Sequence, residues 1–76
     1  MVTAYVLVKA NTGEADRLLQ DIRAIDGIVD ADIVAGDVDI IAKAVVDSPA
    51  DVKEISANRI QSIRGVENTS TYVAMD

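Results

Sequence analysis

The 76-residue chain contains no cysteine, no histidine, no tryptophan and no phenylalanine, and it has a single proline. Without cysteine there is no disulfide, and without histidine the ordinary ligand sets of a structural zinc site are missing. The same absences remove the commonest general base and the readiest nucleophile of enzymes. A domain this short gains stability most simply by self-association. We therefore expect an oligomer with no cofactor, no metal and no catalytic residues.

The charge is also one-sided, with 13 Asp and Glu against 7 Lys and Arg, a formal net charge of −6. An acidic surface without a basic stripe repels phosphate backbones, so direct nucleic-acid binding is not expected. The acidity fits a merely solubilising net charge and equally a protein from a high-salt cytoplasm. Residues 4–8 are apolar but lack a basic flank and a cleavage signal, and no run reaches the length of a membrane span. These features indicate a cytoplasmic protein.

The first half of the chain reads as a strand, a helix and a second strand. Residues 3–10 (TAYVLVKA) are rich in β-branched residues, which favours a strand. A helical repeat of apolar residues begins after Glu14 and stops at Gly27, which is placed as a helix-ending glycine. Residues 28–35 then alternate, and their odd positions are apolar while Asp30 and Asp32 point the other way.

The second half repeats the pattern. Gly36 and Asp37 mark a tight turn, and residues 38–46 predict a third strand that forms a hairpin with the second. Ser48 as N-cap and Pro49 at the first helical position are typical of a helix start. Apolar residues at helical spacing follow, and Gly65 precedes a last strand over residues 66–75.

An internal repeat supports this order. The segment IRAIDGIVDA (residues 22–31) aligns with IQSIRGVENT (residues 60–69) at an offset of half the chain. Each copy contains a helix end, a glycine and a strand start. Two such β-α-β halves predict a single α+β domain over residues 1–76, a ferredoxin-like βαββαβ sandwich. Its four-stranded antiparallel sheet would carry both helices on one face.

The other face of that sheet is expected to be apolar and uncovered. It would carry five residues from three strands: Tyr5, Leu7, Val34, Ile41 and Val45. Monomers rarely expose a contiguous apolar patch, so dimerisation of one sheet against another is the simplest interpretation. The alternative is that these are scattered surface residues.

Other polar features give weaker signals. The hairpin carries four acidic residues: Asp30, Asp32, Asp37 and Asp39. Their spacing does not match that of a calcium loop, so we interpret them as a solvated acidic rim. The loop Asn11-Thr12-Gly13 has neither a Cys-x-x-Cys pair nor an anion-binding arginine. Arg59 falls on the apolar face of the second helix. It can reach a carboxylate across a subunit interface, or lay its stem on the core with its head in water, which is the commoner arrangement.

Two segments resemble the Lrp/AsnC family of leucine-responsive and asparagine-responsive regulators. The hairpin V-A-G-D-V-D (residues 34–39) is similar to the Gly-x-aromatic-Asp turn of their effector-binding (RAM) domain. The end G-V-E-N-T-S-T-Y-V-A-M (residues 65–75) is similar to their closing Gly-Val-x-x-Thr-x-Thr strand. The resemblance covers essentially the whole chain. It implies a stand-alone version of the effector domain, because no helix-turn-helix precedes it.

The resemblance further implies dimers that assemble into octamer-like rings and bind small effectors, typically amino acids, between dimers. It assigns effector binding to seven residues: Gly36, Asp37, Val38, Asp39, Thr71, Tyr72 and Val73. The Asp39 carboxylate can pair with an α-ammonium group, or it can accept local backbone hydrogen bonds as a turn residue. Val38 stands where the family often has an aromatic residue, which implies a smaller effector or a weaker site.

Three functions follow from these expectations. The first is an oligomeric, amino-acid-binding module that modulates a partner such as a full-length Lrp/AsnC regulator. The second is a purely structural oligomerisation domain. The third, with least support, is a small enzyme of the dimeric α+β-barrel kind, for which the sequence offers no base or cofactor site.

Overall fold

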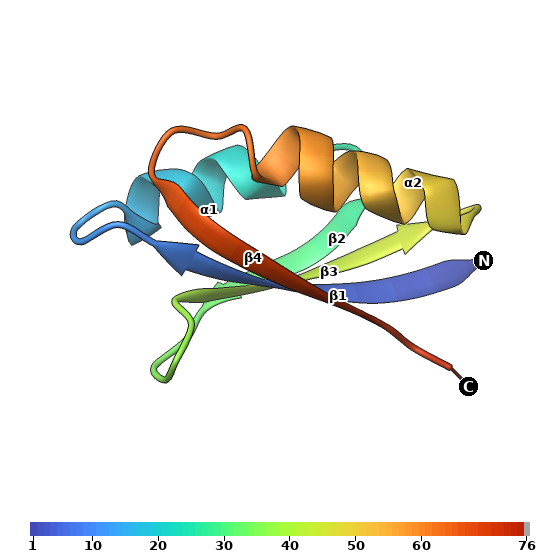
Figure 1. Cartoon of the computed structure of the whole chain (residues 1–76), viewed down its shortest axis with the longest axis horizontal. Helices are drawn as coiled ribbons and strands as arrows, with labels where there is room; N and C mark the ends of the chain where they lie inside the picture. The colour runs from blue at the N-terminus through green and yellow to red at the C-terminus, as the bar shows by residue number, and fades with distance from the viewer. Residues whose placement is uncertain (76) are drawn as a thin grey trace.

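Two helical segments lie across one face of a four-stranded antiparallel sheet in a computed structural model that describes residues 1–75 (Figure 1). The elements, in chain order, are β1 (Val2–Ala10), α1 (Ala15–Arg23), β2 (Ile28–Ile33), β3 (Ile40–Val46), α2 (Pro49–Lys53), η1 (Glu54–Ile60) and β4 (Val66–Val73). The strand order is β2-β3-β1-β4. The expected ferredoxin-like βαββαβ fold is therefore confirmed. No helix among the described residues is long and apolar enough to cross a membrane.

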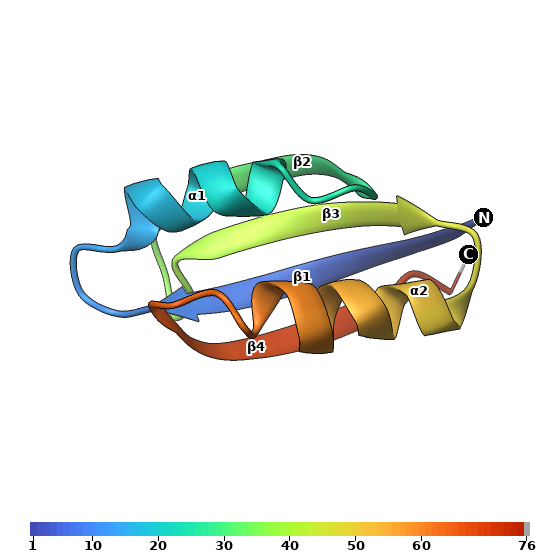
Figure 2. The ribbon, with the colours of Figure 1, turned by 90° about the horizontal axis from the view of Figure 1, so that it is seen from above.

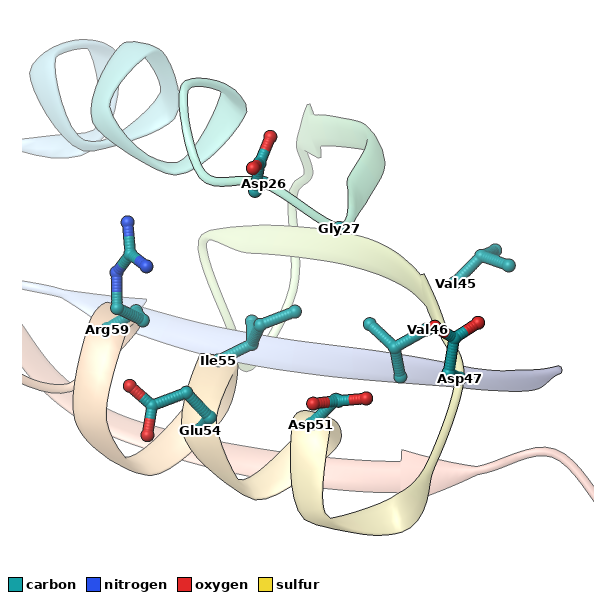
Figure 3. A pocket seen from close by; sticks show the side chains of 9 residues that line it. All are labelled: Asp26, Gly27, Val45, Val46, Asp47, Asp51, Glu54, Ile55 and Arg59. Atoms are coloured by element: carbon teal, nitrogen blue, oxygen red, sulfur yellow. The ribbon is translucent and has the colours of Figure 1, made fainter.

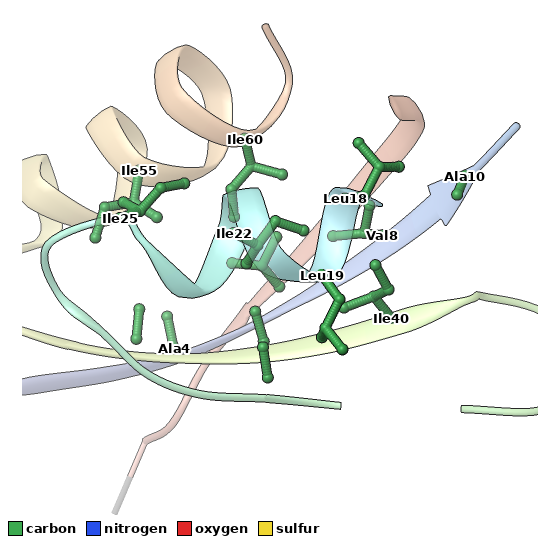
Figure 4. Packing of buried hydrophobic residues seen from close by; sticks show 14 of the residues in the cluster. Ala4, Val8, Ala10, Leu18, Leu19, Ile22, Ile25, Ile40, Ile55 and Ile60 are labelled. Atoms are coloured by element: carbon green, nitrogen blue, oxygen red, sulfur yellow. The ribbon is translucent and has the colours of Figure 1, made fainter. Parts of the chain in front are cut away.

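Each helical segment covers a different part of the sheet (Figure 2). Helix α1 contacts β2 and β3, whereas α2 and η1 contact β3, β1 and β4. The core between the layers is built from β1 and β3 residues of even number and from the inner faces of the helices. Val8 and Ile40 are fully buried below Leu18 and Ile22 (Figure 4), and Val6 is fully buried as well. The helices therefore cover the face of the sheet that carries the even-numbered residues of β1 and β3.

The two halves of the internal repeat fold into the same turn. In the first, Ile25 N–H donates to the Ile22 carbonyl (3.1 Å) and Ile28 N–H to the Ile25 carbonyl (3.2 Å). In the second, Ile63 N–H donates to Ile60 (3.0 Å) and Val66 N–H to Ile63 (3.2 Å). The glycines within these turns have φ angles of +97° and +102°, which a side chain disfavours. The repeat therefore encodes a helix-to-strand turn that needs glycine.

The predicted alternation of the second strand is wrong at its start. A β-bulge between Ile28 and Asp30 shifts the pairing with β3, so Ile28 packs against the core and Val29 is 60% exposed. After the bulge, Ala31 is buried as expected, but Ile33 is 45% exposed because β2 is an edge strand. The strand ends at Ile33, two residues earlier than predicted.

The second helix changes geometry halfway along. It begins at Pro49 after Ser48, as predicted, but the Ser48 hydroxyl donates to the Asp51 carboxylate (3.1 Å) and makes no backbone cap. From Glu54 to Ile60 the segment is a π-helix, and Gln61 N–H donates to the Ser56 carbonyl five residues back (3.2 Å). The wider turn brings Ile60 into the core.

Arg59 lies within this π turn and is exposed, one residue before the buried Ile60. This exposure agrees with the expected arrangement, in which the stem of Arg59 lies against the core and its head is in water.

Candidate effector site at the hairpin turn

The β2–β3 turn is closed by a single residue, Asp39. Its carbonyl accepts from Val34 N–H (2.9 Å), and its own N–H donates to the Val8 carbonyl (2.9 Å). Its carboxylate Oδ2 accepts from Ala10 N–H at 2.8 Å, in a partly buried hydrogen bond between residues 29 positions apart. The turn is therefore attached to β1 through both the backbone and the side chain of Asp39.

This arrangement corrects two expectations. The third strand begins at Ile40 and not at residue 38, because Val38 and Asp39 still belong to the turn. The Asp39 carboxylate accepts a backbone hydrogen bond, as the turn interpretation expected, but the donor is Ala10 on β1 and not a local residue. The Lys9 ammonium group also reaches the turn and donates to the Asp37 carbonyl at 3.4 Å. The Asp37 side chain is exposed.

The second segment that the resemblance assigns to effector binding lies elsewhere. Thr71, Tyr72 and Val73 are exposed on β4, at the end that carries both chain termini (Figure 1). Val73 pairs with Ala4 of β1, whereas Ile40, just after the turn, pairs with Val8. Thr71 pairs with Val6, so the two segments are separated by about 7 to 13 Å along β1 and by about 10 Å across it. One chain does not bring them together.

The helix-free face of the sheet carries the other predicted set of residues. The strand register places Leu7 opposite Ile41, Tyr5 opposite Tyr72, and Val45 opposite Thr3. Tyr5 is 39% exposed and Tyr72 61% exposed, while the other apolar residues of this face are half-buried. Val34 follows β2 and is also half-buried. No helix or strand of the described chain covers this face.

A cleft on the helix side was not predicted from the sequence. It measures about 460 Å³ and lies between the α1–β2 turn, the end of β3 and the second helix (Figure 3). The rest of the lining is Gly27, Val45, Val46 and Ile55. The rim carries four carboxylates and one guanidinium: Asp26, Asp47, Asp51, Glu54 and Arg59. Asn58 donates to the Glu54 carboxylate at 2.7 Å. No group of three or more acids in residues 1–75 is arranged to hold a metal ion.

No motif marked this cleft, because its residues are spread over three elements that only the fold brings together. The one hint was Arg59, an arginine out of place on an α-helical period.

Comparison with known proteins shows which ferredoxin-like domain this is. A family model described as the Lrp/AsnC ligand binding domain matches residues 3–76. The chain therefore belongs to the Lrp/AsnC ligand binding domain family, as its hairpin and final strand suggested. An uncharacterized HTH-type transcriptional regulator from Pyrococcus abyssi is 30% identical over 77 residues. That match covers 97% of this chain and 51% of the regulator, so the chain spans about half the length of this curated relative.

Solved structures share the fold over the whole chain. TTHA0845 from Thermus thermophilus superposes with a TM-score of 0.96 at 25% identity, over 100% of this chain and 95% of that one. The transcriptional regulator NMB0573 from Neisseria meningitidis superposes with a TM-score of 0.87 at 13% identity, over 99% of this chain and 50% of that one. The Neisseria protein was crystallised as a complex with L-Met.

Proposed function

We propose that this domain is an oligomeric regulatory module that binds an amino acid and acts on transcription regulators in the cytoplasm. The observation that carries the proposal is the distance between the two effector segments within one chain. The hairpin turn and residues 71–73 are separated by β1, and their levels along that strand differ by several residues. A site that uses both segments therefore needs at least two copies of the chain.

The turn suits the charged ends of an amino acid. Residues 35–38 form the tip of a loop that Val34 and Asp39 close. The Asp37 carbonyl accepts from Lys9, and we propose that other peptide groups of the tip bind the ligand. The Neisseria meningitidis regulator, which has the same fold, was crystallised with an amino acid. Val38 offers a smaller side chain than the aromatic residue that is frequent in the family.

The bare sheet face supports assembly. Leu7, Ile41 and Val45 lie on neighbouring strands beside Tyr5 and Tyr72. Lys43 lies opposite Tyr5 on the same face, and the apolar residues around it form the kind of exposed group that is typical of protein–protein contacts. We propose that two chains pack these faces together, that the dimers assemble further, and that the effector binds where dimers meet. Mixed assembly with a full-length Lrp/AsnC regulator would then carry the signal to DNA, since the acidic chain itself is unsuited to bind nucleic acid.

The test is a thermal-shift titration of the purified protein with each of the twenty amino acids, together with sedimentation velocity. An amino acid present at 100 times its dissociation constant should stabilise the folded protein by about 2.7 kcal/mol. We expect at least one amino acid to raise Tm, and an oligomer in sedimentation. If all twenty leave Tm unchanged, the amino-acid function is wrong. If the protein is monomeric at high concentration, the assembly is wrong.

One observation favours a second function, a structural oligomerisation domain without an effector. The turn is already stabilised internally, since the Asp39 carboxylate has its partner in Ala10. A protein that sediments as an oligomer but responds to no amino acid would support this alternative.

A further inference from the structure

The strand register explains why the Asp39 carboxylate binds where it does. Even-numbered residues of β1 turn their backbone groups towards β3, where Val6 lies opposite Ala42 and Val8 opposite Ile40. The next even residue, Ala10, would pair with position 38 if β3 started earlier. The chain has already left the sheet there, because β3 begins at Ile40. The Asp39 side chain takes the place of the missing carbonyl and accepts from Ala10 N–H.

The hydrogen bond to Asp39 gives the nearly buried Ala10 amide an acceptor that it otherwise lacks within the strand pairing. Ala10 is only 9% exposed. The pairing of β1 with β4 also slips between Lys9 and Ala10, so the end of the strand is irregular on both sides. A nearly buried peptide N–H without an acceptor is unfavourable, and a carboxylate is a strong acceptor for it. The Asp39 carboxylate therefore fastens the turn to the end of β1.

We propose that Asp39 is a positioning residue of the effector site, which holds the tip of the turn in its binding geometry through Ala10 N–H and does not contact the effector. This inference rests on the proposed function of the turn. What the role requires is a hydrogen-bond acceptor at the end of the side chain. The positioning role does not require the negative charge, whereas an ion pair between Asp39 and the ammonium group of an amino acid would require it. The acidic side chain left at the tip is the exposed Asp37.

The test compares Asp39→Asn with Asp39→Ala, because asparagine keeps an acceptor oxygen at the same position and loses the charge. Two quantities are measured: the hydrogen-exchange rate of the Ala10 amide without ligand, and the affinity for the amino acid that gives the largest thermal shift. In Asp39→Ala we expect exchange to speed up and affinity to fall, each on the order of tenfold. In Asp39→Asn both should stay within about twofold of the original protein. Asp37→Asn, the matched control, should leave the Ala10 exchange rate unchanged.

Two results would overturn the inference. In the first, Asp39→Asn loses as much affinity as Asp39→Ala while its Ala10 amide stays protected, which would mean that the charge itself binds the ligand. In the second, Asp39→Ala leaves the Ala10 exchange rate unchanged, which would mean that the contact does not hold the turn. Failure of the proposed function looks different: the original protein then binds none of the twenty amino acids, while the exchange rates still report whether Asp39 holds the turn.

Discussion

Ile55 and Ile60 are five residues apart, yet both are buried in the same core (Figure 4). An α-helix returns to the same face after three or four residues, whereas the π-helix η1 returns after a longer step. The π geometry therefore follows from the spacing of the apolar residues. An α-helical segment would bury Arg59 in place of Ile60.

Deletion of Ala57 should convert η1 into a regular α-helix without loss of the fold. Ala57 is exposed, and its removal leaves the two isoleucines four residues apart, which is the α-helical spacing. We expect the free energy of unfolding, measured by urea denaturation, to change by less than about 1 kcal/mol.

Deletion of Gln20 is the control. It removes an exposed residue from the regular helix α1 and rotates Ile22 away from the core. This deletion should cost about 3 kcal/mol or more, or prevent folding. Equal damage from the two deletions would show that the π-helix is not simply an inserted residue.

The difference between a regular element and one with an added residue also explains how far the sequence predicts the fold. The order of elements and the glycine turns follow from periodicity and from the repeat, since both are local properties. The bulge at Val29 and the π turn each add one residue to a regular element. A prediction that assumes a fixed period of two or 3.6 residues then assigns side chains next to the added residue to the wrong face. Val29 on the strand was misplaced for this reason.

Substitution of three glycines by alanine should separate two contributions to the loss of stability: the strain of a left-handed backbone and the steric overlap of the added Cβ. Gly13, with φ of +80°, has no atom within 4 Å of an added Cβ, so Gly13→Ala should cost only the left-handed backbone term of about 1–2 kcal/mol. At Gly27 an added Cβ would lie 2.7 Å from Ile55 Cδ1 and 3.1 Å from Val46 Cγ1. Gly27→Ala should therefore cost about 1–3 kcal/mol more than Gly13→Ala.

Gly65→Ala tests the cause of that difference. Its Cβ would lie 2.8 Å from Arg17 Nη2, the end of a flexible side chain that can move away. We expect a loss between those of the other two variants, measured by urea denaturation of all three. If all three lose the same stability, overlap with the core does not matter at Gly27.

Arg23 protects the β2 edge of the sheet. Its guanidinium donates two hydrogen bonds to the Ala31 carbonyl, from Nε at 3.2 Å and from Nη2 at 2.8 Å. Arg23→Ala should lower the free energy of unfolding by about 1 kcal/mol and expose an edge that favours aggregation. Arg23→Lys keeps the charge and loses the two-pronged geometry, so it should recover only part of the loss. Full recovery would show that charge alone is responsible.

The candidate site is less predictable than the fold. The turn at residues 34–39 and the final strand are recognisable as motifs, but their separation on the two sides of β1 appears only in three dimensions. The role of Asp39 depends on where β3 begins, and a side chain that replaces a strand carbonyl leaves no periodic signal. The proposed completion of the site by a second copy is a property of the assembly, which the residue pattern of one chain does not specify.

Assembly through the bare sheet face gives the last prediction. Leu7 lies in a central strand opposite Ile41, so Leu7→Glu places a charge in the middle of the proposed contact. A carboxylate buried between two packed sheets is strongly unfavourable even with Lys43 on the same face, and we expect sedimentation velocity to show monomers. Gln20→Glu adds the same charge on exposed α1 and should leave the oligomer intact. Circular dichroism should show both variants folded. An oligomer that survives Leu7→Glu with unchanged mass would place the contact on another surface, because a glutamate at that position is incompatible with close packing of the two sheets.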